Sequence, residues 1–216
     1  MDPKGASTRA QAMLPRARPI DSPDPKDQMT VAEFLTFTES RPNAERWELI
    51  EGRPTLQASP SKPHQLIVAN IGGLLWTQKR SLRASWLPLP GVGTLVPASP
   101  NSLPQPDFMV LEHALADDDF SNVTDDALVL FEVISRSNTK RDQSWRRRVY
   151  ASIANCRHYV TVHQRRCEVV CYHRAAGWEG TKITALDATL ALPALGAVLP
   201  LADVYADTPV AKRVAI

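Results

Sequence analysis

The feature that most constrains this chain is an apolar segment, Leu128–Ser135, which carries one carboxylate, Glu132, in its middle. A continuous apolar run of this length, bounded by polar residues, is typical of a strand that is buried on both faces. An isolated carboxylate is very costly to bury, so Glu132 needs a cation, a hydrogen-bond donor or a metal ion as its partner. The identity of that partner is the main question that the sequence raises.

Helical and strand patterns alternate along the chain. Helices are expected near residues 30–40, 64–80, 142–154 and 201–206, and strands near 47–50, 55–58, 86–89, 94–96, 108–111, 128–135, 158–163 and 167–173. This order predicts a mixed α/β (α+β) domain with one principal sheet. We expect residues 1–28 to form a flexible, proline-containing N-terminal tail, residues 29–207 a single domain, and residues 208–216 a C-terminal tail.

Composition excludes some classes of protein and leaves others open. No segment approaches the roughly 20 apolar residues of a membrane span, and we expect neither a membrane protein nor a signal peptide. Three cysteines are an odd number in a chain of 216 residues, which favours a reducing cytoplasm over a disulfide framework. The net charge of +2 does not by itself indicate a nucleic-acid partner, so local clusters of charge must carry that inference.

The first local cluster is acidic. Asp107 stands at the start of one predicted strand and Glu132 lies within another, 25 residues further on. If these strands are neighbours, both carboxylates can reach one spot, and paired carboxylates are typical ligands of Mg²⁺ or Mn²⁺. The alternative is that Asp107 caps a turn and that Glu132 pairs with one of the many arginines.

The second cluster is basic and follows directly. Six cations fall within thirteen residues: Arg136, Lys140, Arg141, Arg146, Arg147 and Arg148. Hydroxyl groups accompany them, and phosphates are held by guanidinium groups, hydroxyls and helix N-termini. A solvated basic helix face would explain the cations equally well. Together, however, a metal-binding acid pair and a phosphate-binding loop indicate metal-assisted phosphodiester hydrolysis.

A competing metal site is weaker. Cys167, Cys171, His163 and His173 lie on two predicted paired strands, and such residues can bind zinc. Their spacing lacks a zinc knuckle, and cysteines at alternating strand positions more often pack as small apolar residues. The aromatic residues are dispersed, which gives no support to a module that stacks single-stranded bases.

Several of these motifs resemble a known family. Residues 132–142, with Arg146 and Tyr150, resemble the central motif of the Uma-two family of putative restriction endonucleases, within the PD-(D/E)XK nuclease superfamily. Pro106-Asp107 is similar to the family's leading Pro-Asp, and three other segments also match in order: Trp47–Gly52, His64-Gln65 and His158–Val162. The resemblance runs from about residue 29 to 207. It implies a restriction-endonuclease-like mixed central sheet flanked by helices.

The resemblance also implies roles for individual residues. The metal ligands would be Asp107, Glu132 and the backbone carbonyl of Val133. Glu48 would be a further ligand or a water-orienting group; the alternative is an exposed carboxylate on the hairpin. Tyr150 is expected in the core. The residues expected to contact substrate or its phosphate are His64, Ser135, Ser137, Lys140 and Arg141. His64 could instead simply begin its helix, and Ser135 could bond Glu132.

The chain departs from the family pattern at the catalytic lysine. The superfamily keeps a Lys two residues after the strand acid, and this chain has Ile134 there. In the Uma-two pattern the Lys lies on the following helix instead, and this chain has Arg146 at that position. The usual acid of the next strand is replaced by His163. An arginine stays charged, so Arg146 can clamp an anion and stabilise the transition state, but it is a poor general base.

Three hypotheses follow. The first is a Mg²⁺- or Mn²⁺-dependent endonuclease that hydrolyses DNA, in which Arg146 acts with Asp107 and Glu132. Duplex cleavage needs two such sites, which a homodimer would supply. The second is a catalytically impaired nuclease fold that binds nucleic acid without cleaving it. The third, another phosphoester substrate, also stays open.

Overall fold

The structure, a computed structural model, describes residues 28–42, 44–116, 119–135 and 138–214. The tail expected over residues 1–28 therefore lies outside the described residues, apart from Gln28. The helices are α1 (Val31–Glu39), α2 (Lys62–Leu82), α3 (Lys140–Ala151), α4 (Leu201–Val204) and α5 (Pro209–Val214). The strands are β1 (Trp47–Ile50), β2 (Arg53–Leu56), β3 (Leu87–Pro90), β4 (Gly93–Thr94), β5 (Phe108–Leu111), β6 (Val123–Thr124), β7 (Ala127–Ile134), β8 (His158–His163), β9 (Val169–His173), β10 (Gly180–Ile183), β11 (Thr189–Leu192) and β12 (Ala197–Pro200).

One mixed sheet forms the centre of the molecule. Its six strands run in the order β10-β9-β8-β7-β5-β3, with β7 parallel to β8 and the other pairs antiparallel. All eight residues of β7 are buried, as the continuous apolar run predicted. The mixed α/β class with a central sheet flanked by helices is confirmed.

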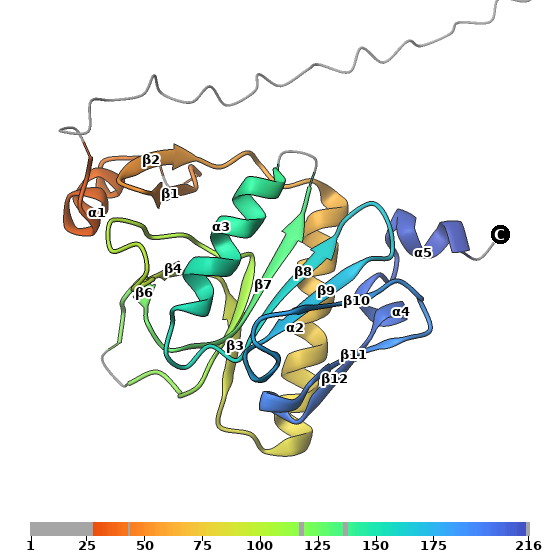
Figure 1. Ribbon diagram of the computed structural model, residues 1–216. Coiled ribbons are helices and arrows are strands. Elements are labelled where there is room, and N and C mark those ends of the chain that lie inside the picture. Colours follow the sequence, from red (N-terminus) through yellow and green to blue (C-terminus); the bar gives the residue numbers. More distant parts are fainter. Residues whose placement is uncertain (1–27, 43, 117–118, 136–137, 215–216) are drawn as a thin grey trace, which may run out of the picture.

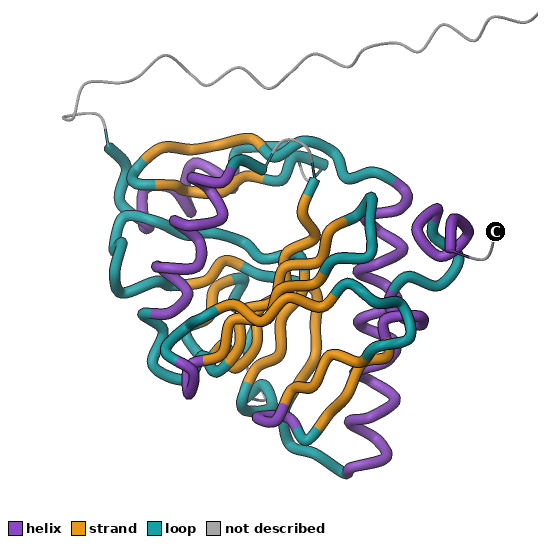
Figure 2. The backbone as a smooth tube through the Cα atoms, turned by 45° about the vertical axis from the view of Figure 1, so that its right-hand side comes forward, coloured by secondary structure: helices purple, strands orange, loops and turns teal. Residues whose placement is uncertain are grey.

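Helices cover both faces of this sheet (Figures 1 and 2). The core on one face joins α2 to α4 and the β11–β12 hairpin, and the core on the other joins α3 to the sheet. Alternate residues of β7 divide between them: Phe131 and Val133 pack on the α2 side, whereas Leu130 packs on the α3 side. Glu132 shares the side of Leu130 because side chains alternate along a strand, and it therefore faces α3.

A glycine allows α2 to pack closely on the sheet. A Cβ atom at Gly72 would stand 2.9 Å from the ring of Phe108. Gly73, next to it, has open space around its Cα. Of the Gly72-Gly73 pair in this helix, Gly72 thus serves close packing and Gly73 does not.

The β1–β2 hairpin is a separate two-stranded sheet that lies above the end of β7. Leu49 pairs with Leu103 through two backbone hydrogen bonds, and Trp145 of α3 donates its indole N–H to the Glu51 carboxylate at 3.1 Å. The hairpin, the first turn of α2 and the first turn of α3 consequently meet at one end of the sheet (Figure 1).

Helix α3 begins two residues earlier than expected, at Lys140. Thr139 caps the helix: its hydroxyl accepts a hydrogen bond from the Asp142 N–H, and the Asp142 carboxylate accepts one from the Thr139 N–H. This reciprocal arrangement is a capping box, and the Thr-x-x-Asp sequence permits it. It fixes the start of the helix that carries Arg146 and Tyr150.

The strands predicted near residues 86–89 and 94–96 are present as β3 and β4, but they do not pair with each other. Strand β3 pairs with β5 and β4 pairs with β6, so the chain passes from one sheet to another at this point. A Cβ atom at Gly91 would stand 1.7 Å from the carbonyl oxygen of Pro106, so only glycine allows the backbone to lie against the segment that precedes β5.

The C-terminal residues also differ from the expected tail. Residues 209–214 form α5, and both Thr208 and Val210 are buried, Val210 in the core on the α2 side. The apolar side chain of Val210 anchors this segment to the domain. Among the described helices, none combines the length and the apolar character needed to cross a membrane.

Candidate functional site

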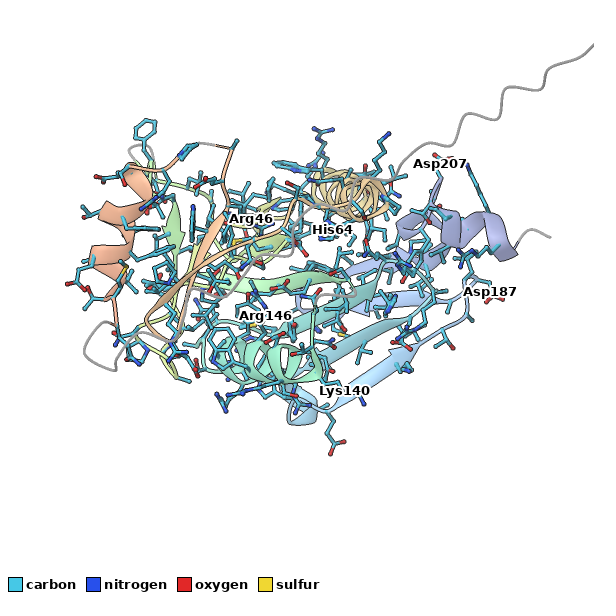
Figure 3. All side chains as sticks on the ribbon, turned by 90° about the horizontal axis from the view of Figure 1, so that it is seen from above. Arg46, His64, Lys140, Arg146, Asp187 and Asp207 are labelled. Carbon is cyan, nitrogen blue, oxygen red and sulfur yellow. The ribbon has the colours of Figure 1, made fainter. Side chains whose placement is uncertain are left out.

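Charged side chains from five segments converge on a pocket of about 200 Å³ at the end of β7. Its ionisable lining residues are Arg46, Glu48, His64, Asp107, Glu132 and Arg146. Figure 3 views the molecule from above, with α2 and α3 on opposite sides of the sheet and Arg46, His64 and Arg146 labelled around this region. We call this cavity the carboxylate pocket.

Asp107 is held in place by hydrogen bonds from both its backbone and its side chain. Its backbone N–H donates to the Phe131 carbonyl at 3.0 Å, which continues the β5–β7 ladder by one residue. Its Oδ2 atom accepts from the Val133 N–H at 2.8 Å and lies 3.1 Å from His64 Nε2, while Oδ1 accepts from Arg46 Nη1 at 3.2 Å. The strands that carry the two predicted acids are therefore neighbours, as the metal hypothesis required.

These contacts determine the charge of Asp107. Burial raises the pKa of its carboxyl group, but the hydrogen bond and charge of His64, the Val133 N–H and the charge of Arg46 together lower it below its usual value. Asp107 is consequently ionised at neutral pH.

The Val133 carbonyl group lies on the same edge of β7 as its N–H. In a strand, the N–H and C=O groups of one residue point to the same neighbouring strand, here toward β5. Strand β5 begins only at Phe108, whose partner is Phe131, so the backbone of Val133 extends past the paired segment. Val133 lines the carboxylate pocket, as the predicted backbone ligand would have to.

Within the described residues, the Glu132 side chain has two hydrogen-bond partners, both on α3. Its Oε1 atom accepts hydrogen bonds from Arg146 Nη1 at 2.9 Å and from the Tyr150 hydroxyl at 3.0 Å. Burial raises the pKa of the Glu132 carboxyl group to about 8; the charge of Arg146 opposes this shift, and the charges of Asp107 and Glu48 add to it. The surroundings thus shift the two acids of the pocket in opposite directions: the pKa of Glu132 is raised and that of Asp107 is lowered.

Arg146 links two buried acids. Its Nη2 atom lies 2.6 Å from Glu48 Oε2, and the other Glu48 oxygen accepts a hydrogen bond from the Gln105 N–H at 2.8 Å. Burial lowers the pKa of Arg146, but the charges of Glu132 and Glu48 raise it well above its ordinary value, so the guanidinium stays charged. Glu48 is only 1% exposed, which excludes the exposed hairpin carboxylate considered above.

The donor types of the pocket fit a hard divalent ion. Asp107, Glu132 and the Val133 carbonyl offer oxygen atoms, which Mg²⁺ and Mn²⁺ prefer. The pocket also holds three carboxyl groups but only two guanidinium groups, so a divalent cation would add positive charge beside the acids. No three of its His, Asp and Glu side chains bring ligand atoms within 4.8 Å of one another in the described residues, so an ion would have to draw its ligands closer.

A second group of ligand-type residues lies elsewhere. Glu112, His113 and Asp126 have ligand atoms within 4.8 Å of one another. Asp126 precedes β7, at the opposite end of that strand from Glu132, and it accepts hydrogen bonds from His113 and from Asn155. These contacts account for the cluster as loop structure.

The predicted substrate-contacting residues divide into three groups. His64 and Ser135 line the carboxylate pocket, and both the N–H and the hydroxyl of Ser135 donate to Asn138 Oδ1, at 2.8 and 2.9 Å. Lys140 and Arg141 are exposed on the first turn of α3 and do not line the pocket. Ser137 lies outside the described residues.

Three residues of the site were not predicted from the sequence. Arg46 reaches Asp107 and donates to the backbone carbonyls of Gln105 and Pro106, and Gln105 binds Glu48. Tyr150 is buried, as expected, but it also bonds Glu132. Its spacing of four residues from Arg146 on a helix is the one sequence signal that could have placed both on the same face.

Comparisons with known proteins identify the family and support the fold. The model of the Uma2 family, described as "Putative restriction endonuclease", matches residues 31–202. Among solved structures, the chain is similar to a putative nuclease belonging to DUF820 from Anabaena variabilis, with 14% sequence identity and a TM-score of 0.65. The similarity covers 82% of this chain and 97% of that one, and at this identity it shows the fold. A comparison with curated proteins gives no match.

Proposed function

This chain belongs to the Uma2 family, and from that membership we propose that it is a metal-dependent endonuclease that hydrolyses DNA phosphodiester bonds. One observation carries the proposal: Asp107 and Glu132, from paired strands, line a single pocket with the permanently charged Arg146. An acid pair of hard oxygen ligands beside a fixed cation is suited to phosphoryl transfer, because both can oppose negative charge on the phosphate.

The ion would be Mg²⁺ or Mn²⁺, held by the carboxylates of Asp107 and Glu132 and by the Val133 carbonyl. When bound, it would supply Lewis-acid catalysis and a more acidic water. The protein prepares this site in two ways. His64 and Arg46 keep Asp107 ionised, and Arg146 and Tyr150 hold one oxygen of Glu132.

Arg146 serves as an anion clamp in this proposal. Its guanidinium stays charged, so it cannot take a proton from water, but it can oppose the charge that builds on the scissile phosphate. Glu48 holds this guanidinium from the side opposite Glu132, which fixes its position in the pocket. The role of Glu48 is therefore to orient Arg146.

The DNA backbone would extend beyond the pocket over the first turn of α3. Lys140 and Arg141 are exposed there and form no ion pair within the described part of the chain, which leaves them available to phosphates. His64, Ser135 and Ser137 are the remaining substrate-contacting candidates.

A plasmid assay tests this function. Supercoiled plasmid incubated with the purified protein should be converted to open-circular DNA in Mg²⁺ or Mn²⁺, and EDTA should abolish the conversion because the carboxylates alone supply no Lewis acid. Absence of nicking with either ion, across pH values and salt concentrations at which the protein is folded, would contradict the proposal.

A second candidate function is DNA binding without cleavage. The bridge that Arg146 forms between Glu48 and Glu132 favours it, because the guanidinium already supplies positive charge that an ion would otherwise bring. For that function we expect EDTA-resistant DNA binding that weakens steeply with salt, and no nicking. Fluorescence anisotropy with labelled duplex, measured beside the plasmid assay, separates the two functions.

The proposal extends to cellular location and assembly. We place the protein in the cytoplasm, with its DNA, and its three free cysteines agree with a reducing compartment. Cleavage of both strands of a duplex needs two sites, which a homodimer on DNA would provide.

A further inference from the structure

Tyr150 is a core residue with a polar contact in the carboxylate pocket. The residue is fully buried, and its ring packs edge-on against that of Tyr159, with the centroids 5.3 Å apart. Its hydroxyl accepts a hydrogen bond from Arg146 Nη1 at 3.1 Å and donates one to Glu132 Oε1 at 3.0 Å. Since a tyrosine has one hydroxyl hydrogen, its donor capacity is used by Glu132.

The two oxygens of Glu132 are consequently unequal. Oε1 accepts from both Arg146 and Tyr150, whereas Oε2 accepts no hydrogen bond within the described residues. In these residues, the buried polar side-chain atoms without a hydrogen-bond partner are His64 Nδ1 and the Tyr159 hydroxyl. Oε2 also has no partner but is not among them, so it is not fully buried and is accessible from the carboxylate pocket. The carboxyl group is held by one oxygen and presents the other.

Arg146 alone would not maintain this orientation. A guanidinium group commonly binds a carboxylate through two parallel hydrogen bonds, which would engage both oxygens of Glu132. Nη2 of Arg146 is already bound to Glu48, and the Tyr150 hydroxyl occupies the second hydrogen-bonding position at Oε1. Without the hydroxyl, Glu132 could rotate toward the guanidinium and withdraw Oε2 from the pocket.

We propose that Tyr150 is a positioning residue, which orients Glu132 so that Oε2 faces a divalent cation in the carboxylate pocket. This inference rests on the proposed metal-dependent function. Outer partners that orient a metal ligand typically contribute about 10–100-fold to metal affinity. Tyr150 would act in this way through Glu132, without contact to the ion.

Tyr159 provides a matched control for the role of the hydroxyl. It is as fully buried as Tyr150, and its ring contacts Tyr150, but its hydroxyl has no hydrogen-bond partner within the described residues. Tyr150→Phe and Tyr159→Phe therefore each remove one buried oxygen and keep the ring, and only the first removes a contact to Glu132.

Mn²⁺ binding to the full chain tests the inference. Free Mn²⁺ is counted by electron paramagnetic resonance, and thermal unfolding in EDTA verifies that each variant is folded. We expect the Kd for Mn²⁺ to rise about 10-fold in Tyr150→Phe and to stay unchanged in Tyr159→Phe. Replacing Tyr150 with 4-aminophenylalanine restores an N–H donor on the same ring and should return the Kd to within about 3-fold of wild type.

The possible failures can be distinguished. Equal Mn²⁺ affinity in wild type and Tyr150→Phe, or no recovery with 4-aminophenylalanine, would overturn the positioning role while leaving the metal-dependent function intact. A wild-type protein that binds no Mn²⁺ would overturn the metal-dependent function and the positioning role with it. If Tyr150→Phe does not fold, the 4-aminophenylalanine variant decides alone. A Kd within about 3-fold of wild type would then support the role, and a larger increase would contradict it.

Discussion

An Asp107→Ala protein should lose metal-dependent plasmid nicking by more than about 100-fold, which exceeds the usual effect of losing an outer partner of a metal ligand. Asp107 is the ionised acid of the carboxylate pocket, and it is the common acceptor for Arg46, His64 and the Val133 N–H. Alanine removes the proposed ligand and leaves these donors without their acceptor. The initial nicking rate in Mn²⁺, measured against wild type, gives the size of the loss.

Asp187→Ala is the control for this prediction. Asp187 is exposed, and Figure 3 labels it away from Arg46, His64 and Arg146. Its substitution should leave the nicking rate within about 2-fold of wild type, since surface changes away from a site have small effects. If Asp107→Ala also nicked at the wild-type rate, Asp107 would not be a ligand and the observed activity would come from elsewhere.

Arg146→Met should destabilise the metal-free protein by about 3–5 kcal/mol, the usual cost of removing one partner from a buried ion pair. Glu48 and Glu132 are 1% and 5% exposed, and both depend on this guanidinium. Methionine fills much of the same space but leaves two buried acids without a cation. In a domain of this size the midpoint of thermal unfolding should fall by roughly 6–20 °C, measured in EDTA.

Arg148→Met is the matched control for this stability effect. Arg148 lies on the same helix, but it is exposed and forms no ion pair within the described residues. Its substitution should change the free energy of unfolding by less than about 0.5 kcal/mol. Adding Glu48→Gln and Glu132→Gln to Arg146→Met should restore part of the stability, because no buried charge is then left unpaired. An Arg146→Met protein as stable as Arg148→Met would show that the bridge does not hold these elements together.

The sequence indicated most of the fold because the strongest local patterns agree with the tertiary structure. The apolar run around Glu132 is the central buried strand, and the helical period after residue 64 is α2. The two strands on either side of Gly91 were expected, but the local turn signal did not reveal that they join different sheets. The approach of Gly91 to the Pro106 carbonyl is a tertiary contact that no local pattern reveals.

The site was predictable in part for the same reason. Asp107 stood out as an acid at the start of an apolar strand and Glu132 as an acid within one, and the pairing of those strands brings them to one pocket. The direct partners of Glu132 are Arg146 and Tyr150. The sequence left open whether Glu132 pairs with a metal ion or with an arginine, and these contacts show the pairing with an arginine. Contacts between distant segments, such as Arg46 with Asp107, depend on where the β1–β2 hairpin lies on the sheet and carry no sequence signal.

The most direct test of the central claim is anomalous diffraction from crystals of the full chain soaked in Mn²⁺. The proposed function predicts a strong anomalous peak in the carboxylate pocket, within bonding distance of the carboxylates of Asp107 and Glu132 and the carbonyl of Val133, and no such peak in Asp107→Ala crystals. An empty pocket in fully soaked wild-type crystals, with Arg146 still bridging Glu48 and Glu132, would contradict it.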